Sequence, residues 1–173
     1  MLNVTWNQPT FKSLIEAVAP ISEEIKMTFN AEGVEIRVVD YAHVCFIKAI
    51  IYPDSFAKYE VTDQVVIATE VEKLKSILKL AKKNPINMSW GLDESKGGLL
   101  HFEVGEVVKD VGLLQADLVK APNEPTIILP IKVKFDKEHY KTGVDAVSDV
   151  GSIAKIGFDG QNAYMNCQGS TDK

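Results

Sequence analysis

The feature of this sequence that most restricts its fold is a recurring pattern, in which an amphipathic helix is followed by two short alternating strands. Each copy opens on a short apolar strand, and a Gly-containing turn joins the two later strands. In proteins built from such repeats, each repeat is one structural unit that buries its apolar face against its neighbours. The pattern predicts an α+β fold of strand-helix-strand-hairpin units, with helices packed on one face of antiparallel sheets.

The first copy begins with a strand at Leu2 to Trp6, and Pro9 then stands in the first turn of a helix, where proline is tolerated. Apolar residues at i, i+3, i+4 and i+7 mark the buried face of this helix. They are Phe11, Leu14, Ile15 and Val18. Ile25 to Phe29 and Val34 to Val38 alternate as a hairpin, and Val44 to Ile51 follows as an almost continuous apolar strand.

The second copy repeats this order. Val65 to Ala68 is the opening strand, and Thr69 is the expected N-cap of the helix. The expected apolar face of this helix comprises Val71, Leu74, Leu78 and Ala81. A hairpin from Ile86 to Trp90 and from Leu100 to Val104 follows, with Gly97-Gly98 in its turn.

The third copy begins with a strand at Ile131 to Phe135, after which Asp136 caps a helix. The apolar residues of that helix are Tyr140, Val144 and Val147. Ile156 to Phe158 and Ala163 to Cys167 form the hairpin, with the turn at Asp159-Gly160.

A proline-bearing segment separates the second copy from the third. Ala121-Pro122-Asn123-Glu124-Pro125 breaks every periodicity, which indicates an exposed connector. We therefore expect a first domain at 1–112, a connector at 113–130 and a partial second domain at 131–173.

The overall charge restricts how this protein could bind nucleic acid. Its formal net charge is -5, so a general basic character cannot be the basis of DNA binding. Any DNA contact has to come from lysines that cluster locally.

Other parts of the sequence argue against export, membrane insertion and metal binding. Cys45 and Cys167 each lie in an apolar, strand-like run without a CxxC spacing, so we expect buried free thiols. The N-terminus lacks the pattern of a signal peptide, and no apolar segment has membrane-spanning length. These observations predict an intracellular protein with no membrane partner.

Three segments resemble the proliferating cell nuclear antigen family of sliding DNA clamps. Glu32 to Val44 is similar to the family's stretch of Asp/Glu-Gly, an alternating strand, Met-Asp, two small residues, His or Arg, and Val. Tyr52 to Glu60 resembles the following Pro-initiated turn with Phe and Tyr-Glu, and Leu74 to Lys79 resembles the second helix. Tyr41 and Val39 depart from the family pattern, and the family's fourth repeat is absent.

The resemblance implies a DNA polymerase processivity factor that is not an enzyme. Such a clamp encircles duplex DNA without reading its sequence, and binds DNA polymerase, the clamp loader and other proteins that carry a clamp-binding motif. It needs no cofactor or metal. The ring would be a homotrimer or heterotrimer at full length. The expected location is the cytoplasm or nucleoid in an archaeon and the nucleus in a eukaryote.

Lysines on the expected helices are the candidate DNA contacts. Lys75, Lys79 and Lys83 recur at i, i+4 and i+8, with Lys82 beside them. From the residues alone, a solvated helix face is the favoured explanation of this spacing. The resemblance implies that these helices line the central hole, where lysines meet phosphates. Lys12, Lys137 and Lys141 are further candidates on the other helices.

Asp40 to Val44 is a polar break between two apolar strands. A catalytic or metal site there is disfavoured, because the histidines His43, His101 and His139 lie in different repeats without ligand spacing. ATP hydrolysis is not expected, since the sequence has no phosphate-binding glycine loop. The resemblance instead implies an apolar partner pocket. Its expected residues are Asp40, His43, Val44, Leu118 and Val119, although local packing explains the last two equally well.

Two further hypotheses remain beside the replicative clamp: a checkpoint-clamp-like or heteromer-only paralogue that acts as an interaction module, and an enzyme. The resemblance also implies a ring contact through the edge segment Val107 to Leu114. Its partner strand would follow Gly169-Ser170, where only a few residues remain. We therefore expect that these 173 residues do not close a ring by themselves.

Overall fold

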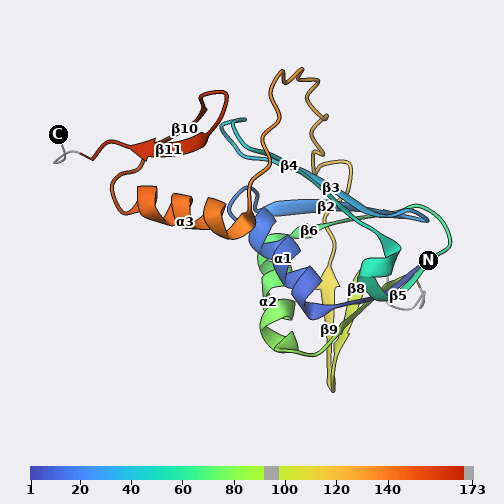
Figure 1. Cartoon of the computed structure of the whole chain (residues 1–173). Helices are drawn as coiled ribbons and strands as arrows, with labels where there is room; N and C mark the ends of the chain where they lie inside the picture. The colour runs from blue at the N-terminus through green and yellow to red at the C-terminus, as the bar shows by residue number, and fades with distance from the viewer. Residues whose placement is uncertain (92–97, 170–173) are drawn as a thin grey trace. The chain divides into compact units, whose positions relative to one another are not determined.

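The computed structural model of the chain describes residues 1–91 and 98–169 (Figure 1). The chain forms two units, Met1–Pro125 and Thr126–Lys173, each of which packs mainly against itself. Gly97, half of the turn expected in the second hairpin, lies outside the described residues, as does the segment after Gly169. Within the described ranges no helix is long and apolar enough to cross a membrane.

The first unit contains both complete repeats. The first repeat forms β1 (Leu2–Trp6), α1 (Gln8–Val18), β2 (Glu24–Asn30), β3 (Gly33–Val39), β4 (Phe46–Ile51), the 3-10 turn η1 (Pro53–Ser55) and β5 (Phe56–Val61). The second repeat forms β6 (Val65–Glu70), α2 (Val71–Ala81), β7 (Ile86–Trp90), β8 (Leu99–Val104) and β9 (Val107–Gly112). The predicted helices and strands occur in the predicted order in both repeats, and the first repeat also contains η1 and β5, which were not predicted.

Strands from the two repeats interleave in two antiparallel sheets. One has the order β5-β1-β7-β8-β9 and the other β4-β3-β2-β6. The first repeat's β1 pairs with the second repeat's β7, and β2 pairs with β6. Neither repeat therefore completes a sheet alone.

Helices α1 and α2 lie side by side and share one core with both sheets (Figure 1). The buried face of α1 is the predicted set Phe11, Leu14, Ile15 and Val18. The buried face of α2 is Val71, Leu74, Ile77 and Ala81. Ile77 thus takes the place expected for Leu78, which is half-buried at the side of the stripe.

The expected N-cap Thr69 is a wrong prediction. Strand β6 continues through Glu70, because Thr69 pairs with Ile25 and Glu70 pairs with Glu24 across the sheet. Thr69 is therefore fully buried in the sheet, and Glu70 precedes the helix without a side-chain cap.

The apolar run from Val44 also differs from expectation. Strand β4 begins only at Phe46, so Val44 and Cys45 belong to the preceding loop and are exposed. Both cysteines are free thiols as expected. Their predicted burial is wrong, since Cys45 is exposed and Cys167 is half-buried.

The second unit contains α3 (Lys137–Ser148), β10 (Ala154–Phe158) and β11 (Ala163–Cys167). Asp136 caps α3 as predicted, accepting hydrogen bonds from the amides of Glu138 and His139. The expected strand at Ile131 to Phe135 is not formed, because the described residues of this unit provide only the β10–β11 pair and no strand beside it. No residue in 126–169 is buried.

Candidate functional site

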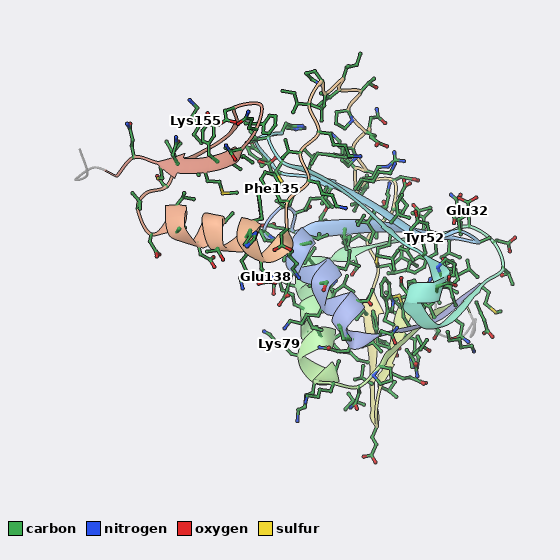
Figure 2. The ribbon with its side chains drawn as sticks, viewed as in Figure 1. Glu32, Tyr52, Lys79, Phe135, Glu138 and Lys155 are labelled. Carbon is green, nitrogen blue, oxygen red and sulfur yellow. The ribbon has the colours of Figure 1, made fainter. Side chains whose placement is uncertain are left out.

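The lysines of α2 differ in whether an acidic neighbour already holds them. Lys73 pairs with Glu70 at 3.0 Å and Lys75 with Glu72 at 2.5 Å. The hydrogen bond from Lys75 lowers the pKa of the Glu72 carboxyl. Lys79 forms no ion pair among the described residues and extends outward from α2 (Figure 2). Its ammonium is therefore available to an anion.

The end of α2 changes the predicted lysine stripe. The helix ends at Ala81, and Lys82 has a positive φ of 50°. Lys83 consequently lies beyond the helix rather than on a fourth helical turn, which corrects the expected stripe of Lys75, Lys79 and Lys83. Both Lys82 and Lys83 are exposed, and the described part of the chain gives neither an ion pair. They are two adjacent cations directly after the end of the helix.

Lys82 and Lys83 therefore extend the cationic surface of α2 past its last turn.

The remaining lysine candidates lie on the other helices. Lys12 on α1 is exposed and lies 3.7 Å from Glu16, a weak solvent-screened pair. Lys137 and Lys141 are exposed on α3, in the second unit. The structure thus places Lys12 and the α2 lysines on two adjacent helices of one unit.

Sequence reasoning missed a further lysine that reaches α2 from an edge strand. Lys109 on β9 donates a hydrogen bond from Nζ to Ser76 Oγ at 2.7 Å. Ser76 in turn donates to the carbonyl of Lys73 at 2.5 Å. Alternation along β9 alone gives no sign that Lys109 contacts a helix.

Asp40 organises the loop expected to border a partner pocket. Its Oδ1 accepts the amides of Val44 at 2.8 Å and Cys45 at 2.7 Å. The hydrogen bond from Cys45 is the main reason that the pKa of Asp40 lies below its usual value. His43 adopts a positive φ of 56° in this turn. The loop therefore presents Val44 to solvent, with 86% of its surface exposed.

The two connector candidates have different environments. Leu118 is 74% exposed, whereas Val119 is only 5% exposed. Of the two, only Leu118 offers its side chain to a partner. Val119 is buried, so it can affect partner binding only indirectly, through the packing of the connector.

The connector is attached to both edges of the four-stranded sheet. The amide of Leu114 donates to the carbonyl of Ala68 on edge strand β6 at 2.8 Å. Lys48 on the opposite edge strand, β4, binds Glu124 at 2.6 Å. This ion pair lowers the pKa of Glu124. Sequence reasoning missed it, because the two residues are 76 positions apart.

The three histidines lie on different elements, and His139 belongs to the second unit. His43 lies in the Asp40 loop, His101 on β8 and His139 on α3. His101 contacts Asp110 through Nδ1 at 2.5 Å and Glu103 through Nε2 at 3.3 Å. No group of side chains in the described ranges is arranged to hold a metal ion.

Two interleaved repeats, with paired helices on one side of antiparallel sheets, define a protein of the DNA-clamp fold. Residues 1–106 match the family model for the N-terminal domain of proliferating cell nuclear antigen. The chain therefore belongs to the proliferating cell nuclear antigen family.

Relatives and solved structures agree with this family. The chain is 27% identical to a DNA polymerase sliding clamp of Picrophilus torridus, over 90% of this chain and 62% of the relative. It is 27% identical to that of Methanosarcina acetivorans, over 100% of this chain and 70% of the relative.

Among solved structures, A. fulgidus PCNA bound to the C-terminal region of FEN-1 matches with a TM-score of 0.91 at 22% identity. That match covers 99% of this chain and 69% of the other. The PCNA2-PCNA3 complex from Sulfolobus tokodaii matches with a TM-score of 0.71 at 17% identity, covering 98% and 70%. These similarities show the fold.

Proposed function

We propose that this chain acts as a sliding clamp, a DNA polymerase processivity factor that surrounds duplex DNA and tethers replication and repair proteins without catalysing a reaction. The observation that carries the proposal is the family match over 1–106. Within that range α2 bears Lys79, which has no ion pair in the described part of this acidic chain. The proposed domain division is a first domain at 1–112, a connector at 113–130 and a partial second domain at 131–173. The proposed location is intracellular.

The proposed DNA contact is electrostatic and independent of sequence. Lysine ammonium groups bind phosphates and release counterions, so affinity falls steeply with salt. The proposed contacts are Lys75, Lys79, Lys82, Lys83, Lys12, Lys137 and Lys141.

The test is polymerase processivity on a primed circular template, using a ring-competent form of the protein. We expect the triple change of Lys75, Lys79 and Lys83 to Glu to reduce DNA retention and clamp-dependent synthesis. Lys58→Glu is the matched control, because Lys58 lies on β5 and pairs with Glu60. Equal losses in both variants would reject the assignment.

The proposed partner site lies between the Asp40–Val44 loop and the connector. One matched structure is bound to the C-terminal region of FEN-1, which supplies a probe peptide. We expect Val44→Glu and Leu118→Ser to weaken its binding in calorimetry, since a few exposed anchors usually dominate such contacts. Unchanged affinity in both variants would place the site elsewhere.

A second candidate is a clamp subunit that works only in a heteromer. The matched PCNA2-PCNA3 complex favours it, because it joins two different clamp chains. Light scattering of the protein alone and with clamp subunits from the same source distinguishes the two. A ring that forms only in the mixture supports the heteromer.

A further inference from the structure

A row of cations crosses the outer face of the four-stranded sheet. Arg37 on β3 is directly opposite Lys48 on β4. Lys26 on β2 is opposite Ala68 on β6, and continuing the Met27–Ile36 register places it opposite Arg37. In the alternating burial of β2 and β3, Lys26 and Arg37 both lie on the face away from the core. We call Lys26, Arg37 and Lys48 the cationic row.

Like charges opposite one another destabilise a sheet, so three adjacent cations need acidic partners. Arg37 binds Glu35 through Nη2 at 2.5 Å, and Lys48 binds Glu124 at 2.6 Å. Among the described residues Lys26 has no ion pair, whereas Arg37 Nε, which also lacks a hydrogen-bond partner, is buried and out of reach of another protein. The row therefore retains capacity for a further carboxylate.

The connector shows which chemistry the cationic row accepts. It is attached at both ends of the row, through Leu114 to Ala68 and through Glu124 to Lys48. Glu124 comes from a segment without helix or strand and places a carboxylate on the row from outside the sheet. Arg37 adds a further attraction to this carboxylate. An acidic side chain of another protein could make the same contacts.

The cationic row adjoins the proposed partner site. Val39 and Phe46, paired with each other, are the next positions on the same face of β3 and β4. The loop of residues Asp40 to Cys45, which exposes Val44, connects Val39 to Phe46. A peptide anchored beside Val44 and Leu118 would thus reach the row with residues flanking its anchor.

We propose that the cationic row binds acidic residues flanking the apolar anchor of a partner peptide, in competition with Glu124. This inference rests on the proposed partner site and adds a preference for acidic flanks. Coulomb attraction at a partly exposed surface supplies the preference, so salt weakens it.

The test compares peptides built on the C-terminal region of FEN-1, with a run of glutamates or of glutamines added before or after it. Binding to the full chain is measured by fluorescence anisotropy at about 0.05 M and about 0.5 M NaCl. We expect a glutamate peptide to bind about fivefold tighter at low salt, and the difference to vanish at high salt.

Variants identify the residues responsible. Combining Lys26→Gln with Arg37→Gln should abolish the preference, while Lys58→Gln on the other sheet should keep it. Glu124→Gln removes the internal competitor and should tighten binding of the glutamate peptide alone. Because these side chains are partly exposed, a thermal melt of each variant checks that the fold is retained.

Three results would overturn the inference about the cationic row. Equal binding of glutamate and glutamine peptides overturns this inference and leaves the partner site standing. Binding of no peptide overturns both. If the Lys26 and Arg37 changes weaken binding of a DNA oligonucleotide but leave the peptide preference intact, the row contacts nucleic acid, and the inference is overturned.

Discussion

The hydroxyl of Tyr59 lies 2.6 Å from the carbonyl oxygen of Gly33 and thereby joins β5 to the turn between β2 and β3. It also lies 2.7 Å from the carbonyl oxygen of Asn30, so the two carbonyls on either side of the turn share its single O–H proton. Burial raises the pKa of Tyr59 to about 12. The two sheets are thus joined by a neutral hydrogen bond as well as by their shared core.

Replacing Tyr59 with Phe should lower the free energy of unfolding by about 1 kcal/mol, the usual net value of one hydrogen bond. Urea denaturation measures this change. Tyr52→Phe is the control, because Tyr52 is 62% exposed and no hydrogen bond is described for its hydroxyl. Equal losses in the two variants would contradict the role of Tyr59.

The raised pKa of Tyr59 also predicts a pH dependence. The folded state disfavours the tyrosinate, so its stabilising effect is fully present below the unfolded pKa of 10.0 and is lost as pH rises toward about 12. Tyr59→Phe should remove this part of the alkaline loss of stability. Unfolding curves at rising pH check the result.

Gly33 should tolerate no side chain. Its φ is +128°, and a Cβ there would lie 2.2 Å from the carbonyl oxygen of Ile51. Gly33→Ala should therefore cost at least about 1 to 3 kcal/mol in unfolding free energy. Gly112→Ala provides the comparison, since its Cβ would meet nothing within 4 Å. A Gly33 variant as stable as the Gly112 variant would refute the clash.

Much of this fold could be predicted from periodicity, because buried faces repeat at fixed intervals along helices and strands. The α1 face is an example. Two predictions of secondary structure were wrong because they depended on partners distant in sequence. Thr69 pairs with Ile25 in the sheet instead of capping α2, and Ile131 to Phe135 forms no strand because no strand lies beside it in the described part of its unit. Asp40 holds the amides of Val44 and Cys45, so β4 starts late.

The candidate site was less accessible from the sequence. Lysine spacing identified α2 but not which of its lysines are neutralised. Lys75 forms an ion pair with Glu72 and is half-buried, whereas Lys79 is exposed. The Lys48–Glu124 pair depends on the path of the connector, which no local pattern encodes.

Individual lysines should contribute unequally to DNA binding. In a ring-competent form, Lys79→Gln should reduce the slope of log affinity against log salt by about 0.9, the value for one lost phosphate contact. Lys75→Gln should reduce it less, because Glu72 already binds Lys75. Titrations at several salt concentrations measure the slopes, with Lys58→Gln as control. A larger effect at Lys75 would contradict this ranking.

Leu118 and Val119 should separate binding from stability. Leu118→Ser should weaken binding of the FEN-1 peptide. It should change the free energy of unfolding by less than about 0.5 kcal/mol, because the Leu118 side chain is 74% exposed. Val119→Ala should instead cost about 1 to 3 kcal/mol of stability, since Val119 is buried. Calorimetry and urea denaturation on both variants test the contrast. A stability loss at Leu118 as large as that at Val119 would contradict it.

A polypeptide of these 173 residues should not close a ring by itself. Edge strand β9 exposes backbone groups that a ring contact would pair with a strand of the next subunit. The described residues of the second unit offer only the β10–β11 hairpin, and they leave Ile156 54% exposed and Phe158 41% exposed. Fully burying such side chains contributes about 1.5 to 3 kcal/mol each, so their exposure deprives this unit of part of the stabilisation that a domain core supplies. We expect light scattering to find a monomer or an ill-defined associate, and limited proteolysis to cut 126–169 before the first unit. A stable closed trimer of this polypeptide alone would refute the argument.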